Sequence, residues 1–286
     1  MKPWSPMRVI SDPTKIKALV HRWRKSEKTL GFVPTMGALH EGHLSLVRRS
    51  VRENAFTVVS IYVNPLQFGP KEDFKQYPRT IEDDLAILGQ EKVSVVFTPS
   101  DREMYPEGFS TRLEVTGPLV RGLCARYRPG HFSGVATIVV KLLGLVQPTT
   151  LYLGQKDAQQ AVILGQVIGD LNLCVRVAVC PIFRERDGLA MSSRNRRLTP
   201  EGRRIAPTLY WSLTAGKNIV KSGIIDAEKV LAEIKKNIRR ESRIKLQYLE
   251  AVDPRTLLPV KKIKSGSLIA LAAYLDNVRL IDNIVV

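Results

Sequence analysis

The chain has 286 residues, 44% of them hydrophobic and 25% charged, a composition typical of a globular protein with a sizeable core rather than a disordered one. Lys and Arg number 44 against 27 Asp and Glu, giving a formal net charge of +17. This excess suggests a nucleic-acid or anionic-membrane partner, but acidic residues are interspersed throughout and no long block of like charge occurs. We therefore expect a basic surface, with no nucleic-acid and no membrane partner.

Cysteine usage and hydropathy point to a reducing compartment. The three cysteines are odd in number and form no CxxC pair, which argues against a disulfide framework or a cysteine zinc site. The first seven residues lack the apolar run of a signal peptide, and the most apolar segment, 135–146, is too short to span a bilayer. We expect a cytoplasmic protein.

Strand-like and helical patterns alternate along the first two thirds of the chain. Segments rich in Val, Ile, Tyr and Phe predict buried strands at 30–34, 57–63, 93–97, 150–153 and 175–180. Helical patterns lie between them at 44–54, 81–90, 134–145 and 158–171. The alternation predicts an α/β fold with a doubly wound, Rossmann-like parallel sheet. Ligands of such sheets bind beyond the carboxyl ends of the strands, so the strand-to-helix junctions are candidate sites.

The pattern changes after about residue 184. Helical patterns at 200–222 and 226–241 precede strand-like segments at 245–251, 268–274 and 278–284, and Leu275-Asp-Asn277 predicts a hairpin turn between the last two. We predict two domains, a Rossmann-like domain at 1–184 and a smaller, lid-like α+β domain at 185–286.

The first strand-to-helix junction carries a histidine pair. Gly37 allows a tight turn, a helix is expected to begin near residues 41–43, and His40 and His43 share one helical face. At a helix start the two imidazoles could bind a phosphate and stabilise charge on departing pyrophosphate. Two partly solvated histidines are the alternative. Because two of the chain's four histidines lie in this turn, H-x-G-H favours nucleotidyl transfer.

Two further junctions offer phosphate-binding groups. In Met191-Ser-Ser-Arg-Asn195, the hydroxyls and the guanidinium could bind phosphate, or the serines could simply cap a helix. In Leu153-Gly-Gln-Lys-Asp-Ala-Gln-Gln160, Lys156 could donate to phosphate, Asp157 could accept from ribose, and Gln160 could bind a carboxylate or hydroxyl. A solvated helix start is the alternative for this segment.

Polar residues in two other loops leave alternatives open. Asn64 and Gln67 follow a strand and are suited to orient a small polar substrate, although Asn64 could instead cap its own turn. His131 could approach phosphate or cap the helix that it precedes. Lys141 lies in an apolar helix and either snorkels to solvent or reaches the cleft.

Taken together, these motifs resemble the pantothenate synthetase (pantoate–β-alanine ligase) family of the nucleotidyltransferase superfamily with an H-x-G-H motif. The resemblance rests on segments that occur in the family's order along the chain: Pro34-Thr-Met-Gly-Ala-Leu-His-Glu-Gly-His43, Val63-Asn-Pro-Leu-Gln-Phe68, Tyr77-Pro-Arg79, Arg128-Pro-Gly-His-Phe132, Asp187-Gly-Leu-Ala-Met-Ser-Ser-Arg-Asn195 and Arg279-Leu-Ile-Asp-Asn283.

The resemblance implies an ATP- and Mg²⁺-dependent ligase that joins pantoate to β-alanine through a pantoyl-adenylate, releasing AMP and pyrophosphate, in pantothenate and coenzyme A biosynthesis. It implies His43, His40 and Lys156 as catalytic residues and a homodimeric assembly. The implied ATP-binding residues are Met36, Gly37, Ala38, Leu39, His40, Glu41, Gly42, His43, Gly154, Gln155, Lys156, Asp157, Phe183, Met191, Ser192, Ser193 and Arg194. The implied substrate-binding residues are Gln67, Gln160 and Asn64.

The sequence departs from the family pattern at two positions. Gln155 stands where the family has Glu, and Ala158 replaces an aromatic residue, so we expect altered ATP affinity rather than loss of activity. Asp83 and Asp84 lie in a region sometimes associated with Mg²⁺, and an acidic pair on a helix surface is an equal alternative; the Mg²⁺ ligands are left unassigned.

Two rival functions remain open at this stage. An aminoacyl-tRNA synthetase-like enzyme would fit the positive charge, but about 100 residues after the second signature leave little room for a tRNA-binding domain. A basic nucleic-acid-binding module is the other rival, although the sequence has no aromatic-interleaved basic strand, zinc spacing or recognition-helix motif.

Overall fold

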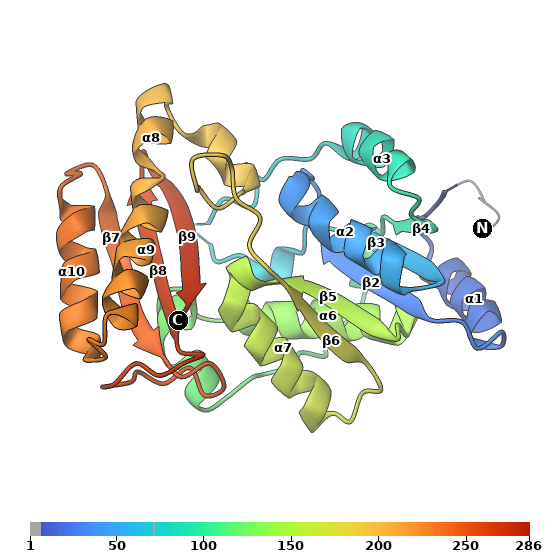
Figure 1. The fold of residues 1–286 in the computed structure, drawn as a ribbon. Helices are drawn as coiled ribbons and strands as arrows, with labels where there is room; N and C mark the ends of the chain where they lie inside the picture. The colour runs from blue at the N-terminus through green and yellow to red at the C-terminus, as the bar shows by residue number, and fades with distance from the viewer. Residues whose placement is uncertain (1–6, 71) are drawn as a thin grey trace. The chain divides into compact units, whose positions relative to one another are not determined.

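The computed structural model describes residues 7–70 and 72–286, which form two compact units (Figure 1). The first unit comprises the residues up to 115 together with 129–154 and 163–180, and the second comprises 116–128, 155–162 and 181–286. The signal-peptide expectation concerns positions 1–6, which lie outside the described residues. Within the described residues, no helix is both long and apolar enough to cross a membrane.

A six-stranded, wholly parallel sheet forms the centre of the first unit. Its strands are β1 (Arg8–Ile10), β2 (Leu30–Thr35), β3 (Phe56–Ile61), β4 (Val95–Phe97), β5 (Thr150–Gly154) and β6 (Arg176–Cys180), in the order β1-β4-β3-β2-β5-β6. The predicted doubly wound α/β fold is confirmed, and β1 is an addition to it. Because the strand order reverses between β2 and β5, the carboxyl ends of these two strands mark the switch point where such folds bind ligands.

Helices of the first unit pack on both faces of the sheet. They are α1 (Pro13–Arg24), α2 (Glu41–Glu53), α3 (Ile81–Gln90), α4 (Asp101–Met104) and α6 (His131–Val146), with the 3-10 turn η1 (Pro65–Gln67), while α7 (Ala158–Asp170) is divided between the units. Helix α2 contacts β2, β3 and β5, and α1 contacts α6. One buried cluster joins Val33 and Val59 of the strands to Val47 of α2 and Leu88 of α3. This packing fixes the start of α2 against the end of β2.

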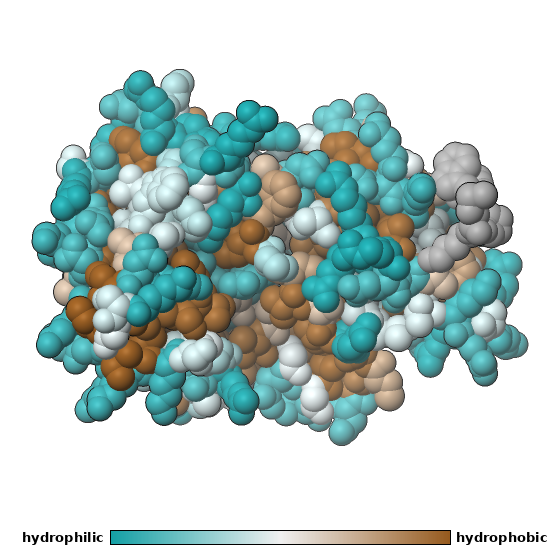
Figure 2. Space-filling model, in the orientation of Figure 1, coloured by the Kyte–Doolittle hydropathy of each residue, from teal (hydrophilic) through white to brown (hydrophobic). Residues whose placement is uncertain are grey.

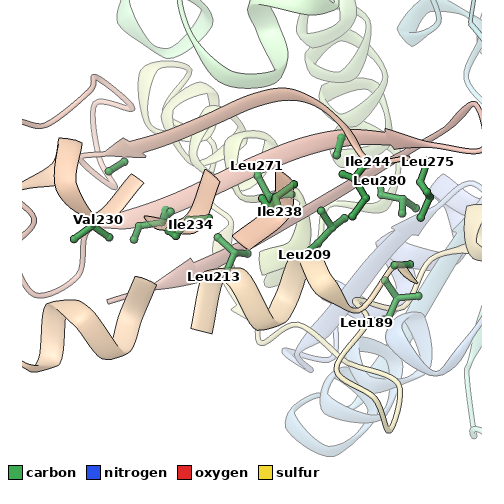
Figure 3. Packing of buried hydrophobic residues seen from close by; sticks show 14 of the residues in the cluster. Leu189, Leu209, Leu213, Val230, Ile234, Ile238, Ile244, Leu271, Leu275 and Leu280 are labelled. Carbon is green, nitrogen blue, oxygen red and sulfur yellow. The ribbon is translucent and has the colours of Figure 1, made fainter. Parts of the chain in front are cut away.

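A three-stranded antiparallel sheet and two helices form the core of the second unit. The strands β7 (Lys245–Val252), β8 (Leu268–Leu275) and β9 (Val278–Val285) are in sequential order. Apolar side chains of α9 (Thr208–Lys221) and α10 (Ala227–Arg239) pack with those of the strands, as Figure 3 shows for Leu213, Ile234 and Leu271. The unit also contains η2 (Pro118–Val120), α5 (Leu123–Tyr127), η3 (Gln155–Asp157), η4 (Ser193–Arg197) and α8 (Pro200–Ile205).

Two local predictions for the second unit have different outcomes. The predicted hairpin turn is confirmed, because Asp276 and Asn277 join β8 to β9 with φ angles of 51° and 62°, as a type I′ turn requires. The single helix predicted at 200–222 is wrong, because the chain forms α8 and α9 with a break at Ala206 and Pro207. Pro207 has no N–H to continue the hydrogen-bond ladder of α8.

Hydrophilic residues cover much of the face seen in Figure 2, with apolar residues between them.

The second unit includes 116–128 and 155–162, which fall within the range 1–184 expected for the first domain. The domain division at residue 184 itself stays a prediction.

Candidate active site

The turn between β2 and α2 presents the histidine pair. After Thr35 the chain turns through Gly37, with φ of 79°, and Ala38, with φ of 49°, and α2 begins at Glu41. His40 is the N-cap residue, and its carbonyl accepts the N–H of His43 at 2.8 Å. The imidazole rings of His40 and His43 stack with centroids 4.0 Å apart and an interplanar angle of 30°. The predicted shared face is thus a direct ring contact at the start of a helix.

Asp84 supports this turn through its carboxylate. The side chain belongs to α3 and is buried, with 1% of the residue exposed, and it accepts the N–H of Ala38 at 2.9 Å and the N–H of Leu39 at 2.8 Å. The helix-surface alternative for the acidic pair is therefore wrong for Asp84 and correct for Asp83, whose side chain is exposed. The sequence carries no local signal for the role of Asp84, because its partners lie about 45 residues earlier.

Asn64 and Gln67 form an amide pair with a defined polarity. Asn64 Oδ1 accepts the N–H of Leu66 at 3.3 Å, and its Nδ2 donates to the carbonyl of Gly134 at 3.1 Å. These two backbone partners assign the Asn64 amide, so Nδ2 also donates to Gln67 Oε1 at 3.2 Å. Gln67 Nε2 then lies 2.9 Å from Met36 Sδ. Gln67 therefore directs an N–H donor toward the end of β2, and Asn64 does cap its own turn.

Helix α6 holds Gln67 from a second side. His131 Nδ1 lies 2.8 Å from the carbonyl oxygen of Gln67, and because that oxygen can only accept, Nδ1 carries the proton in this contact. A Cβ at Gly134 would lie 2.2 Å from the carbonyl oxygen of Leu66, so only glycine permits this approach. Of the alternatives for His131, side-chain capping is wrong, because α6 has no side-chain cap hydrogen bond.

Tyr105 contacts the amide pair, and Lys141 lies over the rings of Tyr105 and Phe109. The Tyr105 hydroxyl donates to Asn64 Oδ1 at 2.6 Å, and Lys141 Nζ lies 4.5 Å from the ring centroid of Phe109 and 5.8 Å from that of Tyr105. Burial lowers the pKa of the Lys141 ammonium. Lys141 therefore rests on aromatic faces, which stabilise its charge by cation–π contact.

In the second unit, η3 carries Lys156 and is held by the last strand. Asn283 Nδ2 donates to the carbonyls of Gln155 at 2.9 Å and Lys156 at 3.0 Å, and its Oδ1 accepts from Gln155 Nε2 at 3.2 Å. Gln155, which stands where the family has Glu, therefore has a hydrogen-bond partner in this structure, because its amide donates to Asn283 Oδ1. Asp157 is exposed, and Gln160 is half-buried.

Lys156 lies in an environment with mixed charges. Burial is the main cause that lowers the pKa of its ammonium, and the Arg194 cation acts in the same direction, while Asp157 and Asp282 oppose the shift. Lys156 and Arg194, distant in sequence, are thus close enough to interact. Two neighbouring cations of this kind suit a polyphosphate, whose charge would offset their repulsion.

The segment 183–197 is stabilised by charged side chains. Arg184 pairs with Asp282, whose side chain is 3% exposed, at 2.7 and 2.9 Å, and its guanidinium lies 4.0 Å from the Tyr210 ring centroid. Arg203 pairs with Glu185 and Asp187. The backbone before the serine pair is therefore supported by ion pairs from two different elements.

The proposed site residues of that segment differ in their contacts. The carbonyl of Phe183 accepts the N–H of Met191 at 3.0 Å. Ser192 is the N-cap of η4 and accepts the N–H of Arg194 at 3.3 Å, and Ser193 is buried. The capping alternative for Ser192 is thus realised, and the capped turn also fixes the backbone direction at Arg194.

Each unit brings together part of the predicted site. The first unit contains the residues from Met36 to His43 together with Asn64, Gln67 and Gly154; the second contains Gln155, Lys156, Asp157, Gln160, Phe183, Met191, Ser192, Ser193 and Arg194. Sequence reasoning did not find the supporting roles of Asp84, Asn283, Arg184 and Tyr105, although it considered Asp84 in connection with Mg²⁺. Of these, only Asn283 stood in a segment singled out for the family resemblance, at the end of the chain.

A sequence family and its curated relatives match nearly the whole chain. The sequence model described as pantoate-beta-alanine ligase matches residues 8–285. The pantothenate synthetase of Thermotoga petrophila is 51% identical over 277 residues, covering 97% of this chain and 99% of the relative. The pantothenate synthetase of Sulfurihydrogenibium sp. is 48% identical over 279 residues, with the same coverage.

Solved structures agree with the sequence relatives. Pantothenate synthetase from Thermus thermophilus matches with a TM-score of 0.93 and 44% identity, over 97% of this chain and 99% of that one. Pantoate-beta-alanine ligase from Francisella tularensis, described as complexed with beta-gamma ATP and beta-alanine, matches with a TM-score of 0.80 and 35% identity, over 98% and 97%.

Proposed function

This chain belongs to the pantoate–β-alanine ligase family and catalyses the ATP-dependent ligation of pantoate and β-alanine, and we propose how its residues divide that reaction. In the first step the pantoate carboxylate attacks the α-phosphorus of ATP and expels pyrophosphate, giving pantoyl-adenylate. In the second step the β-alanine amine attacks the acyl carbon and releases AMP. The first step requires stabilised charge on the phosphates, and the second depends chiefly on proximity.

The stacked His40 and His43 rings at the start of α2 carry this proposal. They follow the end of β2, at the switch point of the sheet, where a helix start already favours an anion. We assign His43 as the proton donor to the departing phosphate oxygens and His40 as its neighbouring donor. The surrounding turn, from Met36 to Gly42, borders the nucleotide.

We assign the remaining nucleotide contacts to the end of β5, to η3 and to the segment 183–197. Lys156 and Arg194 supply cations to the phosphates, with Ser192 and Ser193 as hydroxyl donors, and the mutual electrostatic influence of the two cations supports a shared anion. Asp157 and Gly154 accept the ribose, with Gln155 beside them. Phe183 and Met191 border the adenine.

Pantoate is assigned to the glutamine side chains. Gln67 directs Nε2 as a donor, an orientation imposed by Asn64 and suited to a carboxylate or hydroxyl oxygen. Gln160 contributes a second amide from the start of α7. Once the acyl-adenylate has formed, these amides keep its carbonyl in place for the amine.

Mg²⁺ fits this site as an ion carried by ATP. Among residues 7–70 and 72–286, no group of three or more His, Cys, Asp or Glu side chains is arranged to hold a metal, and both carboxylate oxygens of Asp84 already accept backbone N–H groups. Mg²⁺ commonly binds through substrate phosphates with few protein ligands. When bound, it would neutralise phosphate charge beside Lys156 and Arg194.

The family resemblance also supports a homodimer in the cytoplasm. Neither assignment depends on the residue roles above. Sedimentation of the purified protein would measure the first, and fractionation of cells would measure the second.

Isotope exchange between ATP and pyrophosphate tests the central assignment. We expect exchange that requires pantoate and proceeds without β-alanine, whereas exchange driven by an α-amino acid would favour the synthetase-like alternative. His43→Ala should lower the exchange rate by on the order of 100-fold or more. His21→Ala, an exposed histidine of α1, is the matched control and should retain the wild-type rate. Near-normal exchange in His43→Ala would remove this residue from the catalytic role.

A further inference from the structure

We propose that Asp84 is a positioning residue for adenylate formation, because its buried carboxylate holds the turn that places His40 and His43. Each carboxylate oxygen accepts one backbone hydrogen bond: Oδ2 accepts the N–H of Ala38 at 2.9 Å, and Oδ1 accepts the N–H of Leu39 at 2.8 Å. The residue itself is 1% exposed. A carboxylate that bridges two successive N–H groups fixes the direction of the peptide between them.

Three successive N–H groups of this turn face the protein. The N–H of Gly37 donates to Thr35 Oγ1 at 3.2 Å, and those of Ala38 and Leu39 donate to Asp84. In phosphate-binding loops such N–H groups point at the ligand. Here these three N–H groups bind other protein atoms, so contacts to the nucleotide phosphates come from the imidazole rings and the start of α2. The turn therefore orients the histidines and does not bind phosphate through these N–H groups.

The turn needs such an anchor because its conformation is strained. Ala38 has a φ of 49°, a region that L-residues with a Cβ disfavour. Gly37 has a φ of 79°, and a Cβ there would lie 2.9 Å from Asp84 Oδ2. The carboxylate therefore fits directly against the backbone of Gly37, and two charge-assisted hydrogen bonds offset the strain at Ala38.

The helix that carries Asp84 is well placed for this task. The N–H of Asp84 donates to the carbonyl of Thr80 at 2.9 Å, which fixes the first turn of α3. Leu88, one turn further, is fully buried in the cluster shared with β2 and α2. The carboxylate is thus held by packing on the same elements that carry the histidines.

The test compares Asp84→Asn with Asp83→Asn, the same change at the exposed preceding position. The asparagine amide turns one acceptor into a donor that faces a backbone N–H. We expect Asp84→Asn to lower kcat for pantoate-dependent ATP–pyrophosphate exchange by on the order of 100-fold, with KM for ATP changed less than about fivefold. The half-saturating Mg²⁺ concentration should be unchanged, and conversion of supplied pantoyl-adenylate by β-alanine should continue at a nearly normal rate.

Other outcomes overturn the proposal. A raised Mg²⁺ requirement that excess Mg²⁺ repairs would make Asp84 a metal ligand. Parallel loss of both half-reactions would mean general destabilisation, and equal loss in Asp83→Asn would mean a charge effect. If Asp84→Asn does not fold, Gly37→Ala disturbs the same contact from the turn and must show the same selective loss.

The inference rests on the proposed roles of His40 and His43, and the two can fail separately. Wild-type protein without pantoate-dependent exchange would refute the proposed function. Wild-type protein with normal exchange and an unaffected Asp84→Asn variant would refute only the positioning role.

Discussion

Two glycines of α6 should respond to the same substitution with opposite signs. A Cβ at Gly134 would lie 2.2 Å from the carbonyl oxygen of Leu66 and 2.7 Å from the N of Gln67, whereas a Cβ at Gly144 would meet nothing within 4 Å. Because the atoms near Gly134 belong to the backbone, a side chain cannot simply rotate away. Gly134→Ala must therefore push η1 away from α6.

The magnitudes follow from three contributions. Overpacking against rigid atoms costs up to about 3 kcal/mol. Loss of the hydrogen bond from Asn64 to the Gly134 carbonyl costs about 1 kcal/mol more. Alanine in a helix regains about 1 kcal/mol relative to glycine. By these terms Gly134→Ala should lose about 3 kcal/mol, and Gly144→Ala should gain up to about 1 kcal/mol.

Urea unfolding of the two variants, followed by circular dichroism, measures the difference directly. The displaced Gln67 should also lower kcat/KM for pantoate in Gly134→Ala by about tenfold or more, with no change in Gly144→Ala. A Gly134→Ala variant as stable as wild type, or equal losses in both variants, would refute the argument from close approach.

Three further predictions concern the second unit. Gln155→Glu should lower the free energy of unfolding by about 1–2 kcal/mol, because a carboxylate would face Asn283 Oδ1; wild-type stability in urea would contradict the pairing. Arg184→Met should lower the free energy of unfolding by about 3–5 kcal/mol, because it leaves the Asp282 carboxylate buried without its partner. The double variant with Asp282→Asn should recover part of that loss, and urea unfolding of both variants measures the difference. Burial lowers the pKa of the Lys156 ammonium, so this group loses its proton at a lower pH than an ordinary lysine does. As pH rises through that pKa, kcat/KM for ATP should fall. Folding stability should rise over the same range, because the unfolded state binds more protons than the folded state. In Lys156→Arg the decline in kcat/KM should move to higher pH, and a decline at the wild-type pH would mean that another group causes it.

Local signals in the sequence were sufficient to predict the turn between β2 and α2, which carries the first part of the candidate site. The buried run of β2, Gly37 and the spacing of His40 and His43 all act within a few residues, so they predict the turn and the helix start. The same holds for the Asp276–Asn277 hairpin, where residues that tolerate positive φ separate two strand-like runs. These features depend on backbone preferences that neighbours in sequence determine.

The supporting residues could not be found in this way. Asp84 lies next to Asp83 in a pattern typical of an exposed helix face, and only the packing of α3 against α2 and β2 buries it. Asn283 likewise stands in a strand of alternating character, and its role depends on η3, 128 residues earlier. Such roles follow from tertiary contacts, which a single sequence does not encode in any local pattern.

Two features that were not predicted do have a local signal in the sequence. Pro207 marks the break between α8 and α9, and Asp12 before Pro13 is an N-cap signal for α1, where Asp12 accepts the N–H of Thr14 at 2.7 Å. The three-residue strand β1 is different, because it pairs with β4 across more than 80 residues and has little pattern of its own.

The strand order of the large sheet also sets the sequence of events on the ribosome. β2 is synthesised early and pairs with β3 soon afterwards, but its other neighbour, β5, begins only at Thr150. During synthesis of the intervening segment, β2 is therefore an edge strand with unpaired backbone groups, which can pair with another chain, although it is a central strand of the finished sheet. The same late strand completes the switch point at which we propose that the substrates bind, so we expect aggregation of nascent chains to compete with assembly of this site until β5 has been synthesised.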